Sequence, residues 1–252
     1  MRFASLGSGS RGNALIIESG ATRVMVDCGF GPRQLAARLG KLGLSAADLD
    51  AILVTHEHSD HVSGVAVCAP RHQLEVFMTH GTSAVIASSD LTMQLIDSHA
   101  AFAIGDLEVR PFPVPHDARE PAQFVFSDGC HRLGMLTDAG CVTPHMVEML
   151  SGCDALLLEC NHDVDMLAAG CYPAHLKRRI AGRLGHLDNV AAAGLLERLD
   201  RDRLQHVVAA HLSQENNTAV LAQAALAQVL NCQPDWITVA TQADGFGWRE
   251  IL

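Results

Sequence analysis

The sequence predicts an α/β fold in which layers of β-sheet pack between helices. Short apolar runs alternate with helical patterns along the chain, and the early part is rich in strands joined by tight turns. No Ser/Pro-rich linker, charge block or internal repeat divides the 252 residues, of which 48% are hydrophobic and 18% charged. A chain of this length and globular composition is expected to form a single domain, residues 1–252.

The first part of the chain predicts strands before any helix. A glycine-rich loop at 7–13 separates the first two apolar runs, and Gly20 lies in the turn before the third. A helical pattern follows and ends near Gly43, before a short run of purely apolar residues that indicates a buried strand. The expected elements are strands at 2–6, 14–18 and 23–27, a helix at 32–42 and a strand at 51–54.

The remaining chain alternates between the two kinds of element. Thr143 followed by Pro144 is a typical helix start, because proline fits the first helical position. Three strands follow one another in the middle of the chain, which favours sheets over a regular parallel barrel. We expect strands at 75–79, 107–114, 123–127, 132–136, 154–158, 206–210 and 236–240, and helices at 81–88, 143–150, 173–183, 189–200 and 217–229.

Composition limits the partners and the compartment. The net charge of −10 argues against a generally basic surface, although it allows a local basic patch. Aromatic residues make up 4%, too few for a large base-stacking platform. The eight cysteines include no C-x-x-C pair, which argues against a zinc finger. Without a secretory signal pattern or a run of 18 apolar residues, we expect a protein of the reducing cytoplasm that makes no membrane contact.

The strongest chemical signal follows the predicted strand at 51–54. Residues 55–61 read THEHSDH, so four side chains of metal-ligand type occur within six residues. Imidazole and carboxylate groups suit zinc, manganese or iron. In an extended segment His56 and His58 point the same way, and a turn would bring Asp60 and His61 to a second ion beside the first. The pattern therefore predicts a site for two divalent ions, Zn or Mn with Fe also compatible.

The H-x-H-x-D-H pattern resembles the signature of the metallo-β-lactamase fold, a four-layered αββα sandwich. The resemblance covers nearly the whole chain, and later loops match the family's remaining ligands in the segments FPVPHD, GMLTDAG and VVAAHLSQENN. These segments supply His116, Asp138 and His211. The resemblance implies that one ion is held by His56, His58 and His116, that the other is held by Asp60, His61 and His211, and that Asp138 bridges both.

Two ions about 3.5–4 Å apart lower the pKa of water held between them and stabilise charge on a carbonyl or phosphoryl oxygen. This chemistry indicates hydrolysis, with Asp60 also orienting the nucleophile. Glu159 ends a predicted strand and His186 follows 27 residues later. In nuclease branches of the family such a pair protonates the leaving oxygen, and a carboxylate beside His186 would raise its pKa. The remaining histidines, among them His162, are expected to be surface or hydrogen-bonded residues.

A basic cluster precedes His186 on a predicted helix. Four positive charges within seven residues stand out in an acidic chain, and they suit phosphate groups near the leaving group. A solvated helix face is the alternative interpretation, and the sequence does not decide between the two. The cluster consists of Lys177, Arg178, Arg179 and Arg183.

Five sequence blocks narrow the resemblance to the YycJ/WalJ group of small bacterial proteins related to DNA exonucleases. The blocks are MRFASLGSGSRGNALIIESG, THEHSDHVSGV, LLLECNHDVDML, GHLDN and HLSQENN. The resemblance implies a 5′→3′ DNA exonuclease, with a role in repair, in which hydroxide held between the ions attacks phosphorus. The interval between Glu159 and His186 leaves no room for the accessory domain that larger nuclease relatives insert there.

The loop after the first predicted strand formally matches G-x-G-x-x-G, from Gly7 to Gly12. A dinucleotide site would need a helix opening at the last glycine, whereas the following residues NALIIES read as a strand. We therefore assign the loop to the edge of the site rather than to a dinucleotide. Its candidate contacts to substrate phosphate are Ser8, Ser10, Arg11 and Asn13.

Two alternatives stay open at this point. The acidic charge and scarce aromatics favour a small-molecule hydrolase, such as a cyclic or alkyl phosphodiesterase, a thioesterase or a lactonase. A non-catalytic regulatory protein that uses metal for folding is the third hypothesis, because metal binding can supply stability. The sequence does not separate DNA from RNA, and it leaves the oligomeric state open, a homodimer included.

Overall fold

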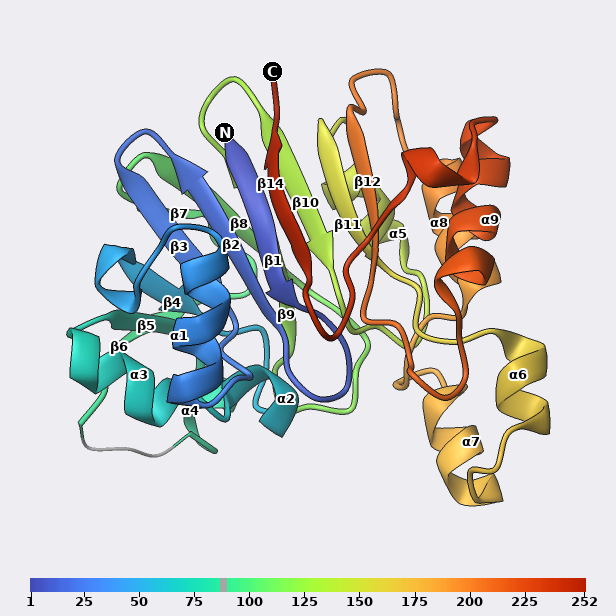
Figure 1. Ribbon diagram of the computed structural model, residues 1–252, viewed down its shortest axis with the longest axis horizontal. Helices are drawn as coiled ribbons and strands as arrows, with labels where there is room; N and C mark the ends of the chain where they lie inside the picture. Colours follow the sequence, from blue (N-terminus) through green and yellow to red (C-terminus); the bar gives the residue numbers. More distant parts are fainter. Residues whose placement is uncertain (87–89) are drawn as a thin grey trace.

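The computed structural model describes residues 1–86 and 90–252, and in it two seven-stranded β-sheets lie face to face between layers of helices (Figure 1). This arrangement confirms the predicted four-layered αββα sandwich. Three apolar clusters separate the four layers, one between the sheets and one beneath each helical layer.

The first sheet is built largely from the N-terminal half of the chain. The β1–β2–β3 meander is antiparallel, whereas β3 to β6 run parallel, because helices and loops return the chain between them. In spatial order the strands are β14 (Phe246–Glu250), β1 (Arg2–Gly7), β2 (Ala14–Ser19), β3 (Thr22–Val26), β4 (Ala51–Leu53), β5 (Glu75–Thr79) and β6 (Thr92–Ile96).

The second sheet mirrors the first. Strands β7 to β10 are antiparallel and β10 to β13 are parallel. In spatial order they are β13 (Thr238–Val239), β12 (His206–Ala210), β11 (Ala155–Glu159), β10 (Arg132–Leu136), β9 (Ala122–Ser127), β8 (Leu107–Pro113) and β7 (Phe102–Ile104).

Helices cover the outer face of each sheet. Apolar residues of α1 (Pro32–Lys41) and α3 (Val65–His72) pack on the first sheet. Those of α5 (Pro144–Leu150), α8 (Asn189–Arg198) and α9 (Ala219–Leu230) pack on the second. Two short helices, α6 (Val164–Ala169) and α7 (Ala174–Ile180), project beside the lower edge of the sandwich in Figure 1.

Strand alternation explains how one sequence serves two apolar layers. In β11, Ala155 and Leu157 join the cluster between the sheets, and Leu156 and Leu158 join the cluster beneath the helices. A strand buried on both faces therefore reads as a continuous apolar run, which is how DALLLE appears in the sequence. Glu159 follows Ala155 and Leu157 on the inner face at the end of the strand.

Most of the expected elements are present, and the differences concern short ones. Strand 236–240 is only β13, because a 3₁₀ turn at Pro234–Trp236 occupies its start. The helix expected at 173–183 ends at Ile180. In place of the helix expected at 81–88 there is a single turn, α4 (His80–Ser83). Residues 87 and 88 of the expected helix lie outside the described residues. The elements that were not predicted are α2 (Ser59–Val62), α3, α6, β6, β7 and β14.

The structure bears on the cysteines and on membrane spans. All eight cysteines are free thiols. Across residues 1–86 and 90–252, no helix is both long and apolar enough to cross a bilayer.

Candidate metal centre

Polar side chains gather where the parallel strands of both sheets end. Asp27 follows β3, Asp138 lies two residues after β10, Glu159 ends β11 and His211 follows β12. The H-x-H-x-D-H segment begins at His56, three residues after the end of β4. Because carboxyl ends of neighbouring parallel strands meet at one edge, these residues converge at the lower edge of the sandwich in Figure 1.

Three imidazoles form the first group, which we call the imidazole cluster: His56, His58 and His116. Nε2 of His56 lies 2.9 Å from Nδ1 of His58, and Nε2 of His116 lies 3.2 Å from the same atom. Nδ1 of His116 donates to the carbonyl oxygen of Gly185 at 2.9 Å, which leaves Nε2 as an electron-pair donor. Three nitrogen atoms thus converge on one point.

The second group consists of Asp60, His61 and His211, and we call it the carboxylate-rich cluster because further carboxylates contact its two histidines. Oδ2 of Asp60 lies 3.3 Å from Nε2 of His61 and 3.4 Å from Nε2 of His211. The two histidines are buried. A side chain at Gly29 would clash with the carbonyl oxygen of Asp60, so the chain needs glycine there for the loop to approach.

Asp138 lies between the two clusters. Its Oδ1 is 3.9 Å from Nε2 of His116, and its Oδ2 is 3.3 Å from Nε2 of His61. The side chain is buried, and Oδ2 accepts no hydrogen bond from the described residues. An ionised buried oxygen without a donor is costly unless a cation is bound beside it.

Asp27 supports the carboxylate-rich cluster, and sequence reasoning missed it. Its Oδ2 faces Nδ1 of His61 at 2.7 Å, and Oδ1 accepts from the backbone N–H of Thr55 at 2.9 Å. A carboxylate on Nδ1 fixes the tautomer and leaves Nε2 of His61 free for a ligand. The signal available in the sequence was an acidic residue directly after the apolar run of β3.

The backbone at Asp27 and His211 is left-handed, with φ of 61° and 54°. Only Gln73 and Asn231 share this feature among the described non-glycine residues, and both end helices. Left-handed non-glycine residues carry strain of roughly 1–3 kcal/mol and persist where the surroundings fix them. At Asp27 and His211 this strain lies at the strand ends beside the two clusters, where the surrounding contacts hold it.

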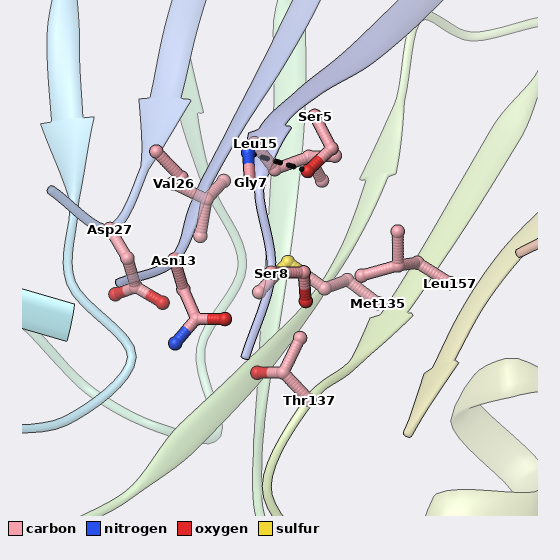
Figure 2. A pocket seen from close by; sticks show the side chains of 11 residues that line it. Ser5, Gly7, Ser8, Asn13, Leu15, Val26, Asp27, Met135, Thr137 and Leu157 are labelled. Atoms are coloured by element: carbon pink, nitrogen blue, oxygen red, sulfur yellow. Dashed lines mark hydrogen bonds between the residues drawn. The ribbon is translucent and has the colours of Figure 1, made fainter. Parts of the chain in front are cut away.

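The glycine-rich loop between β1 and β2 leads into a strand, as predicted, and two of its side chains contact the site. Oγ of Ser8 accepts from the backbone N–H of His211 at 2.8 Å, and Nδ2 of Asn13 donates to Oδ2 of Asp60 at 3.1 Å. Figure 2 shows Ser8 and Asn13 beside Asp27 and Thr137 around a small cavity between the sheets, with room for about one water molecule. Ser10 and Arg11, the other predicted contacts of this loop, are exposed.

Glu159 and His186 form the predicted pair. Nδ1 of His186 donates to Oε1 of Glu159 at 2.7 Å. The other carboxylate oxygen of Glu159 accepts from the backbone N–H groups of Ala139 and Leu187, at 2.8 and 3.2 Å. Nδ1 of His186 also lies 3.4 Å from Oδ1 of Asp138, so the pair adjoins the residue that lies between the two clusters.

The predicted basic cluster lies on and after α7. Arg179 reaches the site through an ion pair with Asp117, whereas Lys177 donates to the carbonyl oxygen of Ala168 at 2.6 Å. Arg178 and Arg183 are exposed. Only one of the four predicted cations is thus tied to the loop of His116.

The donor groups fit divalent ions. Two nitrogen atoms bound tetrahedrally to one zinc ion at about 2.05 Å lie about 3.3 Å apart, close to the spacing found in the imidazole cluster. Four carboxylates (Asp27, Asp60, Asp138 and Glu159) contact these histidines, and none of them pairs with a lysine or arginine in the described part of the chain. Imidazole and carboxylate donors suit zinc, manganese and iron alike.

The two clusters differ in protonation. Burial and the neighbouring imidazoles lower the pKa of His56 well below its ordinary value, and burial lowers that of His116. Burial also disfavours the charged form of His211, but Asp138, Asp60 and Glu159 outweigh it and raise the pKa to about 10. Without bound cations, protons on His211 and His61 balance the carboxylates.

The expectation for His162 was wrong. The side chain is buried, and its Nδ1 has no hydrogen-bond partner among the described residues, so it is neither a surface nor a satisfied histidine. Burial lowers its pKa, which keeps the ring neutral. It lies three residues after Glu159, in the loop that follows β11.

Known proteins match both the sequence and the fold. A family model described as the beta-lactamase superfamily domain matches residues 22–212. Exodeoxyribonuclease YycJ of Bacillus anthracis is 36% identical over 235 residues, which cover 91% of this chain and 89% of that protein. Exodeoxyribonuclease WalJ of Streptococcus pneumoniae serotype 2 is 33% identical over 88% of this chain and 85% of its own length.

A solved structure agrees in fold. The metallo-β-lactamase fold protein YhfI of Bacillus subtilis superposes with a TM-score of 0.76 over 98% of each chain, at 15% identity. The sandwich, the converging clusters and the sequence matches agree with one another. The chain belongs to the metallo-β-lactamase superfamily of metal-dependent hydrolases, in the group that contains YycJ and WalJ.

Proposed function

We propose that this protein is a binuclear metal-dependent phosphodiesterase that shortens DNA from the 5′ end, with a role in DNA repair. The observation that carries the proposal is the Glu159–His186 pair beside Asp138, in a chain similar over most of its length to two exodeoxyribonucleases. An alkoxide leaving group needs a proton donor, and the pair offers one.

Two divalent ions, Zn or Mn with Fe also compatible, would be held by the two clusters. The proposed ligands are His56, His58 and His116 for one ion and Asp60, His61 and His211 for the other, with Asp138 shared. When bound, the ions supply a nucleophile from water at neutral pH and stabilise charge on the phosphoryl oxygens.

His186 acts as the proton donor in this proposal. Burial alone would lower its pKa, but the charge and hydrogen bond of Glu159 raise it above the ordinary value. Glu159 holds Nδ1–H, so Nε2–H is the proton available to the leaving oxygen. Asp60, 3.3–3.4 Å from His61 and His211, would orient the attacking water.

Two segments flank the clusters and would contact the phosphates of the DNA strand. One is the basic cluster on and after α7, and the other is the β1–β2 loop, where Ser10 and Arg11 are exposed and Ser8 and Asn13 are bound to the site. The eight free thiols support placement in the reducing cytoplasm.

The test uses protein loaded with Mn or Zn and duplex DNA labelled at either end. We expect wild type to release short 5′ products step by step. His186→Ala should keep both metals and lose about 10²–10⁴-fold in turnover, as expected for a missing proton donor. Asp60→Ala should lose metal and turnover together. His206→Ala is the control, because His206 begins β12 at the end far from the site, and its side chain donates to the carbonyl oxygen of Glu250.

No shortening by metal-replete wild type would contradict the nuclease assignment and direct the search to small phosphodiesters. Full turnover by His186→Ala would contradict its role as proton donor while leaving the nuclease assignment intact.

A further inference from the structure

Asp117, the residue after His116, lies at the rim of the imidazole cluster. Its Oδ1 is 3.6 Å from Nε2 of His116 and 3.9 Å from Nε2 of His58. The side chain is 29% exposed, so it is open to a bound substrate. A bare carboxylate here would repel a phosphate at the moment it reached the metal centre.

Arg179 neutralises that carboxylate and keeps most of its own donors free. Its Nε donates to Oδ2 of Asp117 at 2.6 Å. Neither Nη1 nor Nη2 donates a hydrogen bond to any described residue, and the side chain is 59% exposed. A guanidinium has five N–H donors in a rigid fork, so fixing Nε leaves the end of the fork for an anion.

The segment that carries Arg179 is anchored to the loop of His116 by its backbone. The N–H of Asp117 donates to the carbonyl oxygen of Leu184 at 3.0 Å, and Gly185 accepts from Nδ1 of His116. A side chain at Gly140 would clash with the backbone of Arg183, so the segment also lies directly on the loop of Asp138. The fork of Arg179 therefore stands at a fixed place relative to both clusters.

The other cations of the basic cluster lack this arrangement. Lys177 is turned back to Ala168 at the end of α6, and Arg178 and Arg183 make no side-chain bond within the described chain. Ordering a free, exposed side chain on binding costs conformational entropy, whereas Arg179 is already held.

Resting on the proposed function, we propose that Asp117 is a positioning residue that holds Arg179 to bind a phosphate of the substrate strand beside the scissile one. The terminal Nη1 and Nη2 atoms would contact two oxygens of that phosphate, the paired geometry in which guanidinium binds phosphate best. The pair would add affinity for a nucleic-acid strand, which carries a second phosphate. It would add none for a substrate with a single phosphodiester.

The experiment compares Arg179→Ala, Arg179→Lys and Asp117→Ala in metal-loaded protein. Arg110→Ala is the matched control, since Arg110 pairs with Glu108 on an exposed part of β8. Three quantities are measured for each: metal content, hydrolysis of bis(p-nitrophenyl) phosphate, and KM and kcat on an oligonucleotide at several salt concentrations. Binding of a fluorescent oligonucleotide is measured separately from cleavage.

For Arg179→Ala we expect KM for the oligonucleotide to rise about 10-fold or more, since hydrogen bonds to charged groups are strong. The slope of log KM against log salt should shrink by about 0.7–0.9, the loss of one phosphate contact. Metal content and hydrolysis of the single-phosphodiester probe should match wild type. Arg179→Lys should recover the salt slope, and Asp117→Ala should raise KM by less than Arg179→Ala.

An unchanged KM and salt slope in Arg179→Ala would overturn the inference, as would an equal loss on the single-phosphodiester probe, which indicates a structural role. If wild type binds the oligonucleotide without cleaving it, the proposed function fails. In that case, weaker binding by Arg179→Ala but not by Arg110→Ala would support the inference, and unchanged binding by Arg179→Ala would contradict it.

Discussion

The two ends of strand β11 each hold a buried carboxylate, and the partners of these carboxylates differ. Asp154, just before the strand, accepts from Nε of Arg203 at 3.0 Å and from the backbone N–H of Arg132 at 2.7 Å. Glu159, at the other end, faces the imidazoles of His186 and His211.

A guanidinium is permanently charged and stays with its carboxylate, so Asp154 is paired for stability alone. An imidazole gains and loses its proton near neutrality and can bind a metal instead. The same buried charge thus supports structure at one end of the strand and exchangeable cations at the other. Substitutions near Glu159 should therefore lower activity, whereas a substitution at Asp154 should lower stability.

The largest effect is expected for Asp138→Ala, next to Glu159. Asp138 is the side chain close to both clusters, so its loss should weaken both metal sites together. Outer partners of metal ligands typically change affinity by about 10–100-fold, and we expect this substitution to exceed that. Metal content by mass spectrometry and turnover on DNA check it. Two tightly bound ions in Asp138→Ala would show that it does not bridge them.

Glu159→Gln should come next, with turnover reduced by about 10²-fold or more while metal content holds. The amide keeps a hydrogen bond to His186 but removes the negative charge that raises its pKa. The pH profile supplies the check. Activity that needs protonated His186 falls as pH rises through its pKa, and in Glu159→Gln this fall should begin at lower pH. If the fall in activity occurs at the same pH as in wild type, Glu159 does not raise the pKa of the proton donor.

Proton release on metal binding should distinguish the two clusters, because each proton released changes the metal affinity by about tenfold per pH unit. The pKa of His211 is raised to about 10 in the metal-free protein, so His211 is protonated at pH 7 and must lose that proton to bind metal. Affinity at the carboxylate-rich cluster should therefore increase between pH 7 and pH 9. The lowered pKa values of His56 and His116 predict no such release at the imidazole cluster. Calorimetry in buffers of different ionisation enthalpy counts the protons.

Asp154→Asn should have the smallest effect on activity. Loss of the charge-assisted bond to Arg203 is expected to lower the free energy of unfolding by about 1–3 kcal/mol, measured by urea denaturation. Turnover per folded molecule should equal that of wild type, because the residue lies at the opposite end of the strand from the metal centre. A loss of turnover without a loss of stability would break the comparison between the two ends.

Much of the fold and of the metal centre could be predicted from the sequence, because the signals were local. The run from His56 to His61 is contiguous, and Asp138 and His211 each follow an apolar run that had to be a strand. Asp27 and Asp117 were missed because their roles depend on contacts with His61 and Arg179, far away in the chain.

Short elements were missed for a related reason. The three residues of β7 and the four of α2 are too few to display a period, and only pairing with their neighbours makes them regular. Buried His162 was misjudged because burial is set by the packing of the loop after β11, which no local pattern records.

The most direct test of the central claim is the anomalous diffraction of crystals grown with manganese. We expect two peaks of anomalous density per chain. One should lie among His56, His58 and His116, the other among Asp60, His61 and His211, with Asp138 touching both. Manganese bound elsewhere, or a single ion that leaves Asp138 without a cation, would contradict the assignment of this edge as a binuclear catalytic centre.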